Sequence, residues 1–305
     1  MTLHKNFING EWVEGKGTRD NINPSDVSDI VGVYAQADRA QAETAIAAAK
    51  AAAPSWAATT PQQRADILEA VGTELLARKD EIGRLLSREE GKPLANGIAE
   101  TMRAAQIFKF FAQETLRIEG VAVASVRPGV DVLITREPLG VVGIICPWNF
   151  PIAIPAWKMA PALAFGNTVV LKPADLVPGT SWALVEIISR SGLPKGVLNL
   201  VMGRGSVVGQ TMLESRDVNA ISFTGSVETG AKVAMVCAQR GAKFQLEMGG
   251  KNPLVVLDDA NIDAAVAAAI DGAFYQTGQR CTASSRLIVQ GKVHDSFVDK
   301  MVTAM

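Results

Sequence analysis

From residue 140 onward, short apolar runs alternate with helix-like stretches, and this pattern restricts the fold more than any other feature of the chain. The apolar runs predict buried strands at 141–146, 168–171, 197–201, 220–223 and 254–257. Helix-like stretches lie between them at 179–191, 206–214 and 226–240. Continuous apolar strands that alternate with helices predict an α/β fold with a parallel sheet covered on both faces. Such sheets bind ligands at the carboxyl ends of their strands.

The first third of the chain is predicted to be mainly helical. Asp38 and Gln41 resemble a capping box that opens a helix over 39–53. Thr60 is followed by a proline and then by Gln63 at the reciprocal position, which marks a second helix start. A further helix is expected over 97–117.

A hairpin is predicted next, with strands at 121–126 and 132–136 joined by a Pro-Gly turn. It is either an arm that pairs with another subunit or an edge hairpin of the same domain. The residues alone leave both interpretations open.

Composition excludes several classes of protein. The 305 residues suffice for two domains or one large α/β domain, and a net charge of −1 gives no electrostatic case for binding nucleic acid or an anionic membrane. The three cysteines lie far apart without a CxxC pair, which argues against a disulfide framework or a metal site and for a reducing compartment. No apolar run reaches the ~18 residues of a membrane helix, and the first residues lack a signal-peptide core. We therefore expect a soluble cytoplasmic protein.

A thiol and a carboxylate form the strongest candidate pair for chemistry. Cys281 lies in a polar, loop-like segment beside Arg280, a cation that would favour the thiolate. Glu247 is followed by a methionine and two glycines, which free the backbone near it. The only histidines, His4 and His294, lie at the two ends of the chain, so a Cys–His or Ser–His–Asp site would need its base from a terminus.

Each member of this pair also has a structural interpretation. Free cysteines are often inert core residues. That interpretation suits Cys146, in a strand, and Cys237, on an alanine-rich helix, but not Cys281 in its polar segment. Glu247 has the alternative of an ordinary exposed glutamate.

Polar residues follow two of the predicted strands. Asn149, in a loop fixed by two prolines, is placed to aim an amide at a developing oxyanion, or it is a turn asparagine that bonds to its own backbone. Lys172 and Asp175 are placed to hydrogen-bond a ribose, or they form a solvated strand end.

Two glycine-containing segments offer phosphate sites. Residues 223–226 (FTGS) follow a strand and open a helix, so their amides suit a pyrophosphate, although simple βα turns look alike. Gly203, Gly205 and Gly209 approximate a dinucleotide loop, but the third glycine falls one residue late for GxGxxG.

Five motifs in order resemble those of the NAD(P)-dependent aldehyde dehydrogenase superfamily. They are PWNFP at 147–151, LKPA at 171–174, FTGS at 223–226, LEMGGKNP at 246–253 and GQRC at 278–281. The resemblance covers essentially the whole chain from Phe7 onward. It implies a Rossmann-like parallel sheet with flanking helices, NAD or NADP as cofactor and a small-molecule aldehyde as substrate. The family's nucleotide loop also departs from GxGxxG, so the late glycine no longer argues against a cofactor.

The resemblance also implies catalytic roles. Cys281 attacks the aldehyde to give a thiohemiacetal, whose oxyanion is held by the side-chain amide of Asn149 and the backbone N–H of Cys281. After hydride transfer to the nicotinamide, Glu247 activates water to hydrolyse the thioester. Lys158 assists proton transfer.

Cofactor contacts are implied in the same way. Lys172 binds the adenosine ribose, Ser226 binds the pyrophosphate and Trp148 packs near the cofactor. The expected cofactor-binding residues are Cys146, Pro147, Trp148, Lys172, Ala174, Asp175, Gly205, Gly209, Phe223, Thr224, Gly225, Ser226, Glu247, Met248 and Gly249. Asp175 favours NAD because it would repel a 2′-phosphate, but it is shorter than the glutamate often found there, so use of both NAD and NADP is expected.

Within the family, residues 151–163 and 278–286 look like α-ketoglutaric semialdehyde (2,5-dioxovalerate) dehydrogenases. An anionic substrate needs a cation, for which Arg103 is the first candidate and Arg280 the second, with a surface or structural role as the alternative for each. Phe150 and Trp157 complete the expected substrate pocket. The alternatives are a succinate semialdehyde or CoA-acylating enzyme, and a nucleotide-binding fragment without turnover; retention of Glu247 weighs against the CoA-acylating type.

The expected domains are an NAD(P)-binding domain over 1–118 and 139–250, an oligomerisation hairpin over 119–138 and the start of a catalytic domain over 251–305. Members of the family run much further than residue 305, so the catalytic domain is expected to be truncated and the piece alone to be inactive or unstable. Whole family members are usually homodimers or homotetramers.

Overall fold

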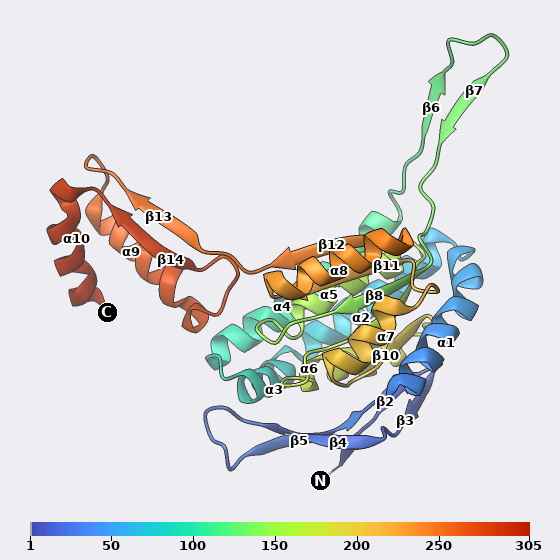
Figure 1. Ribbon diagram of the computed structural model, residues 1–305, viewed down its shortest axis with the longest axis horizontal. Coiled ribbons are helices and arrows are strands. Elements are labelled where there is room, and N and C mark those ends of the chain that lie inside the picture. Colours follow the sequence, from blue (N-terminus) through green and yellow to red (C-terminus); the bar gives the residue numbers. More distant parts are fainter. Residues whose placement is uncertain (1) are drawn as a thin grey trace. The chain divides into compact units, whose positions relative to one another are not determined.

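The computed structural model describes residues 2–305 and divides into two units (Figure 1). Unit 1 contains the described residues up to Thr224 together with Glu228–Leu246. Unit 2 contains Gly225–Val227 and Glu247–Met305. Unit 1 thus carries most of the expected cofactor residues, and unit 2 carries the candidate nucleophile and base.

A seven-stranded sheet with the order β12-β11-β8-β9-β10-β2-β3 forms the centre of unit 1. Its strands are β2 (Asn6–Ile8), β3 (Glu11–Val13), β8 (Val141–Ile145), β9 (Thr168–Lys172), β10 (Leu198–Leu200), β11 (Ala220–Gly225) and β12 (Lys243–Met248). The pairs β11–β8, β8–β9 and β9–β10 are parallel, whereas β2 joins β10 antiparallel. Every residue of β9 is buried, as expected for a strand covered on both faces. The predicted parallel α/β sheet is confirmed.

Helices connect the parallel strands. They are α5 (Ala153–Ala164), α6 (Gly179–Ser189), α7 (Gln210–Glu214) and α8 (Val227–Arg240). The single helix predicted over 206–214 is wrong in its first half, which is a π-helical turn, η1 (Gly205–Gly209), bounded by two glycines that weaken regular α-helical geometry. Helix α5 was not predicted, because Pro155 and Pro161 interrupt its pattern.

Five short strands that the sequence did not predict precede the first helix. Three of them, β1 (Leu3–His4), β4 (Gly17–Ile22) and β5 (Ile30–Gln36), form a separate sheet in the order β1-β5-β4. Strands of two or three residues, and a polar strand such as β4, show no usable alternation of apolar and polar residues. Tyr34 and Ala35 of β5 pack into the main core of unit 1.

Four helices follow: α1 (Arg39–Ala57), α2 (Pro61–Ala77), α3 (Lys79–Glu90) and α4 (Leu94–Thr115). The predicted helices over 39–53 and 97–117 are confirmed with shifted ends, and the capping box of Thr60 and Gln63 is present in full. The capping box expected at Asp38 is wrong in one half. Asp38 Oδ1 accepts from the backbone N–H of Gln41, but the Gln41 side chain does not accept from the backbone of Asp38. Gln41 Nε2 donates to the carbonyl oxygen of Glu14, and Gln41 Oε1 has no hydrogen-bond partner among the described residues.

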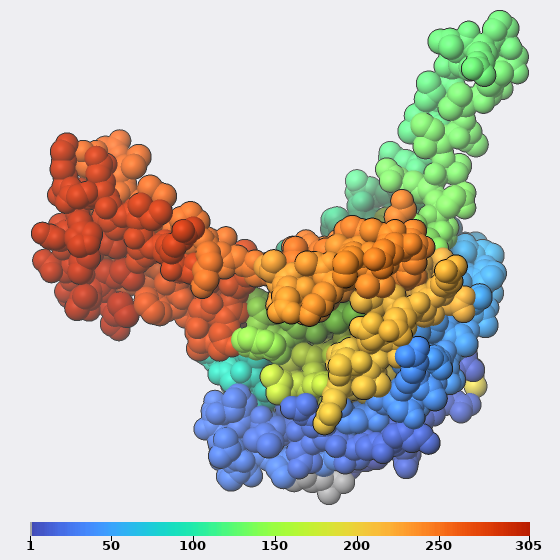
Figure 2. Space-filling model, in the orientation of Figure 1, coloured from blue at the N-terminus to red at the C-terminus, as the bar shows by residue number. Residues whose placement is uncertain are grey.

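The predicted hairpin is confirmed as β6 (Val121–Ala124) and β7 (Asp131–Ile134), paired antiparallel. Within residues 2–305 it pairs with no other strand, so it is not an edge hairpin of the main sheet. All eight strand residues are exposed, and Figure 2 shows the side chains of this segment open to solvent.

Unit 2 is built on two parallel strands, β13 (Asn252–Val256) and β14 (Ser284–Val289). Between and after them lie α9 (Ile262–Phe274), the 3₁₀ turn η2 (Tyr275–Gly278) and α10 (Gly291–Ala304). Its buried core is small and consists of Val256, Val266, Ala269 and Phe297. The strand predicted at 254–257 is confirmed with an earlier start.

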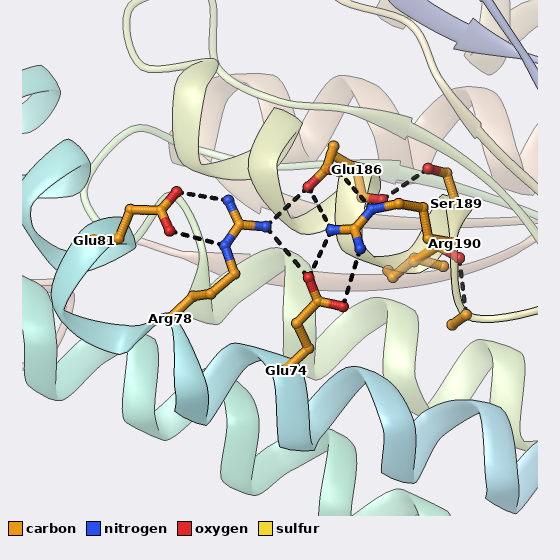
Figure 3. A network of polar contacts seen from close by, with 8 residues as sticks. Glu74, Arg78, Glu81, Glu186, Ser189 and Arg190 are labelled. Carbon is orange, nitrogen blue, oxygen red and sulfur yellow. Dashed lines mark hydrogen bonds and ion pairs between the residues drawn. The ribbon is translucent and has the colours of Figure 1, made fainter.

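An ion-pair network joins α2, α3 and α6 within unit 1 (Figure 3). Glu186 of α6 is bound by Arg78 at 2.9 Å and by Arg190 at 2.6 Å. Arg78 also pairs with Glu81, and Arg190 with Glu74, each at 2.6 Å. Burial raises the pKa of Glu186, but the hydrogen bonds from Arg190 and Arg78 outweigh it, and the net pKa is lowered.

We expect Glu186→Gln to lower the free energy of unfolding of unit 1 by about 1 kcal/mol near neutral pH. Because the folded-state pKa of Glu186 lies below its ordinary value of 4.5, its contribution is present above that value and is lost as the pH falls through the folded pKa. Urea unfolding followed by tryptophan fluorescence reports unit 1, because all five tryptophans lie in it. Exposed Glu119→Gln is the matched control. A destabilisation equally large at neutral and at strongly acidic pH would contradict this account.

Candidate active site

A buried lysine fixes the backbone of the loop that carries Asn149. Lys92 Nζ donates to the carbonyl oxygen of Asn149 at 2.8 Å and lies 4.6 Å from the ring centroid of Phe150. The same amine pairs with Glu100 of α4 at 2.6 Å, and both side chains are almost fully buried. The peptide that follows Asn149 is therefore anchored to the helical layer rather than free in solvent.

Glu100 also holds the start of α5. Its Oε1 accepts from the backbone N–H groups of Ile152 and Ala153 at 3.2 and 3.1 Å. Helix α5 has no cap from the side chain of Ile152, so this carboxylate satisfies amides that would otherwise be unpaired. Burial raises the pKa of Glu100, and the charge of Lys92 opposes the rise.

Lys158 lies buried on α5 and reaches the strands on one side of the sheet. Its Nζ donates to Ser222 Oγ at 2.8 Å and to Gln245 Oε1 at 3.0 Å. Ser222 Oγ in turn lies 2.7 Å from Gln245 Oε1. Gln245 and Glu247 are two residues apart on β12, so strand geometry points both side chains to the same face.

The end of β9 presents a buried amine and a half-buried carboxylate. Lys172 Nζ donates to the carbonyl of Pro173 at 2.5 Å and lies 3.9 Å from Asp175 Oδ1. Burial lowers the pKa of Lys172. Asp175 Oδ2 pairs with Arg19 at 3.8 Å, while its buried Oδ1 has no hydrogen-bond partner within residues 2–305.

Two glycines leave space beside Lys172. A Cβ added at Gly205 would meet only Lys172 Cε, at 3.9 Å, and one at Gly209 would meet Ile145 and Lys172 no closer than 3.7 Å. Thr224 Oγ1, at the end of β11, is a second buried oxygen without a hydrogen-bond partner in the described part of the chain. The unsatisfied Asp175 oxygen and the glycine-lined space beside the buried Lys172 fit the ribose and phosphates of a dinucleotide.

The remaining expected cofactor residues contribute in different ways. Phe223 and Cys146 are buried in the two cores of unit 1, so only their backbone groups are available to contact a cofactor. Ser226 is exposed directly before α8. Pro147, Ala174 and Gly225 are half-buried, and Trp148 is 41% exposed.

Cys281 lies in a turn of unit 2 and is exposed. The side chain of Asn252, at the start of β13, donates to the carbonyl oxygen of Cys281 at 2.6 Å and to that of Ala283 at 3.2 Å. A Cβ added at Gly250 would lie 3.8 Å from the same Cys281 oxygen. The segment that follows Glu247 and the turn that carries Cys281 are therefore neighbours. Glu247, Met248 and Gly249 are all exposed.

The backbone before Cys281 is strained. Gln276, Thr277 and Gly278 all have positive φ, of 51°, 57° and 70°. A β-branched residue such as Thr277 rarely adopts this conformation, and strain of this kind collects at functional sites.

Arg280 makes contacts within unit 2. Its Nη2 donates to the carbonyl oxygens of Asp271 and Gly272 near the end of α9, at 2.7 and 2.9 Å, and its guanidinium carbon lies 4.9 Å from the ring centroid of Tyr275. The guanidinium closes the carboxyl end of a helix, which favours the structural alternative for this arginine. The expected roles of Arg280 toward the thiolate and an anionic substrate stay predictions.

Arg103 is exposed on α4 and makes no ion pair within residues 2–305. Trp157, on α5, is 42% exposed. Both keep their expected substrate roles as predictions, because a substrate contact requires accessible atoms. The two other cysteines are inaccessible: burial raises the pKa of Cys146 to about 12 and also raises that of Cys237.

Sequence reasoning missed the residues that hold the candidates in place: Lys92, Glu100, Ser222, Gln245 and Asn252. One signal was available. Glu100 falls on the same helical stripe as the buried residues Gly97, Ala104 and Phe108, and a carboxylate in an apolar stripe needs a buried partner. The other partners come from distant parts of the sequence and carry no local signal.

Among the described residues, no helix combines the length and the apolar character needed to cross a membrane.

Comparison with known proteins agrees with the five motifs. The model of the aldehyde dehydrogenase family matches residues 12–305. The chain is 46% identical over 304 residues to the alpha-ketoglutaric semialdehyde dehydrogenase of Bacillus subtilis, covering 99% of this chain and 62% of that protein.

Solved structures give the same result. The crystal structure of an Escherichia coli NADP-dependent enzyme matches with a TM-score of 0.96 and 38% identity, covering 99% of this chain and 63% of that one. Betaine aldehyde dehydrogenase from Staphylococcus aureus in complex with NAD+ matches with a TM-score of 0.96 and 35% identity, covering 99% and 60%. The chain spans about three fifths of the length of these relatives. It belongs to the aldehyde dehydrogenase family.

Proposed function

We propose that this chain is the cofactor-binding and nucleophile-bearing part of an enzyme that oxidises an aldehyde to a carboxylate with NAD(P)+. The observation that carries the proposal is the geometry of unit 2, where exposed Cys281 follows a strained segment and is tied by Asn252 to the residues after Glu247. Family membership supports the reaction type.

Cys281 Sγ is the nucleophile in this proposal. It adds to the aldehyde carbon, a C–S bond forms, and the carbonyl electron pair moves to oxygen. The side-chain amide of Asn149 and the backbone N–H of Cys281 donate to that oxyanion. The anchored peptide of Asn149 lets its amide be set before the reaction rather than ordered during it.

Bound NAD(P)+ supplies the acceptor for the hydride that the substrate carbon loses. In unit 1, Lys172 and Asp175 would hold the ribose, and the open space at Gly205 and Gly209 would accommodate the cofactor. Residues 223–226 would bind the pyrophosphate through their backbone amides. The domain division predicted from the sequence assigns these same residues to a nucleotide-binding domain.

Hydrolysis releases the product. Glu247 takes a proton from water, the hydroxide adds to the thioester carbon, and the C–S bond breaks to return the Cys281 thiolate and a carboxylate. Lys158, which hydrogen-bonds to Ser222 and Gln245, is proposed to relay protons along the face of β12 that also carries Glu247.

We propose α-ketoglutaric semialdehyde as the substrate. Support comes from the 46% identity to the Bacillus subtilis enzyme and from an exposed arginine, Arg103, that is available to an anionic substrate. Phe150 and Trp157 complete the proposed pocket.

We further propose that the protein acts in the cytoplasm as a homodimer or homotetramer. Three widely spaced cysteines suit a reducing compartment. The exposed hairpin β6–β7 presents unpaired strand edges and apolar side chains that suit another subunit.

The direct test is turnover of α-ketoglutaric semialdehyde with NAD+ and with NADP+, followed by absorbance of the reduced cofactor. The assay compares the 305-residue chain with a chain extended to the length of its relatives. We expect a steady rate in the extended chain, abolished by Cys281→Ala and retained by Cys237→Ala. Absence of turnover in both chains with every aldehyde tried would sink the proposal.

Thiol accessibility tests the choice of nucleophile. In the native chain we expect one of the three cysteines to react quickly with a thiol reagent such as iodoacetamide at pH 8, because Cys146 and Cys237 are buried with raised pKa values. Cys281→Ser should remove the fast reaction, and denaturation should expose all three thiols of the wild type. Fast labelling of Cys146 in the folded protein would contradict the structure.

Arg103→Ala tests the substrate. Loss of its charge should raise KM for the semialdehyde by about tenfold, while KM for propanal, which has no carboxylate, should change less than about twofold. Arg84→Ala, which removes another exposed arginine of unit 1, is the control. Equal effects on both aldehydes would remove Arg103 from the pocket.

A further inference from the structure

A cavity of about 710 Å³ lies within unit 1 where the hairpin β6–β7 joins the helical layer. One side of the cavity consists of the two segments that connect the hairpin to the fold, residues 117–119 and 136–138. The other side comes from the end of α1, the start of α2 and the residue that follows α5. None of the residues that line it belongs to the proposed catalytic, cofactor or substrate sites.

The chain segments around this cavity are packed closely. A Cβ added at Gly166, whose φ is +79°, would lie 3.0 Å from Pro138 and 3.3 Å from Ala57. Asn167 Oδ1 accepts from the backbone N–H groups of Leu139 and Gly140 at 2.7 and 3.1 Å. The returning end of the hairpin is therefore fixed to the fold, and the cavity keeps a defined wall on that side.

A buried arginine offers the cavity a free donor. Arg64 of α2 is only 6% exposed. Its Nε donates to the carbonyl oxygen of Ala164 at 2.8 Å, and its Nη1 donates to that of Thr59 at 2.5 Å and to Thr59 Oγ1 at 3.2 Å. Its Nη2 makes no hydrogen bond within residues 2–305, so the N–H groups of this nitrogen stay available on a side chain that lines the cavity.

The charge of Arg64 has no acidic partner. Burial lowers the pKa of its guanidinium, and no carboxylate raises that pKa. Of the glutamates that line the cavity, Glu114 pairs with Arg117 at 3.3 Å, Glu137 accepts from a neighbouring threonine hydroxyl at 3.1 Å, and Glu119 is exposed. A buried cation without an opposite charge is costly, and an anionic ligand would reduce that cost.

The remaining lining indicates what kind of anion would fit. Ile118, Pro138 and Phe165 present apolar atoms, and Arg136 on the hairpin side makes no ion pair in the described part of the chain. A cavity of this volume is larger than one inorganic anion needs and has the size of sites that enclose small organic molecules. Apolar walls beside a buried guanidinium suit an organic carboxylate.

We propose that this cavity binds a small organic carboxylate. Its carboxylate oxygens accept hydrogen bonds from Arg64 Nη2, its apolar body packs against Ile118 and Phe165, and Arg136 provides a second cation. Such an occupant contacts both ends of the hairpin and the helical layer at once. The site shares no residue with the proposed catalytic and cofactor sites, so it stands or falls independently of the proposed function.

Calorimetric titration of the 305-residue chain at pH 7 tests the site. The probes are benzoate, benzamide, which has nearly the same shape without the charge, and inorganic phosphate, which has the charge without an apolar body. Ile118→Glu places a carboxylate in the apolar wall and keeps the hydrogen bonds of Arg64, whose own replacement would also remove structural contacts. Arg136→Gln removes the second cation. Arg127→Gln, in the exposed turn of the same hairpin, is the matched control.

We expect benzoate to bind at least about tenfold more tightly than benzamide or phosphate. Ile118→Glu should weaken benzoate binding by about tenfold and Arg136→Gln by about threefold, and Arg127→Gln should leave it unchanged. Equal affinities for benzoate and benzamide, or tighter binding of phosphate, would overturn the choice of an organic carboxylate. Unaltered benzoate binding by Ile118→Glu, or no binding by the wild type up to about 20 mM, would overturn the site itself.

Discussion

Two buried carboxylates hold the helices of unit 1 onto the ends of its sheet. Glu100 accepts the first amides of α5, and Glu89 accepts those of Gly179 and Thr180, at 2.7 and 2.8 Å, where α6 begins. Neither helix has a side-chain cap of its own. A buried carboxylate is costly unless it is fully bonded, so each of these residues specifies one arrangement of helix and sheet.

This arrangement determines where the reactive groups lie. Because β8, β9 and β11 are parallel, the loop of Asn149, the Lys172–Asp175 pair and Thr224 all lie at the carboxyl ends of strands, on one edge of the sheet. Lys92 links the Glu100 carboxylate to the Asn149 peptide, so the same interaction that fixes α5 also fixes a proposed oxyanion donor. In unit 2, the side chain of Asn252 donates to the carbonyl oxygen of Cys281 and so fixes the turn that carries the thiol.

The sequence predicted the parallel sheet, the hairpin, most helices and the exposed setting of Cys281, because these depend on local patterns of apolar residues, glycine and proline. It missed β1–β3, which have only two or three residues, and β4, which is polar. It also missed β5, and it missed α5, whose prolines interrupt the helical pattern. It gave Arg280 an anion-binding or thiolate-favouring role, but the side chain bonds to α9 carbonyls ten residues or fewer away. The contacts of Lys92 and Glu100 with residues 149–153 join segments roughly 50 residues apart, and no local rule predicts them.

In the proposed mechanism, Cys281 carries the substrate and Glu247 releases it. The most direct measurement uses a Glu247→Gln variant of the chain extended to the length of its relatives. It is mixed with α-ketoglutaric semialdehyde and NAD+, quenched in acid and analysed by peptide mass spectrometry. We expect an acyl group on the peptide that contains Cys281, where it accumulates because hydrolysis is blocked. An unmodified Cys281 together with continued release of carboxylate would contradict it.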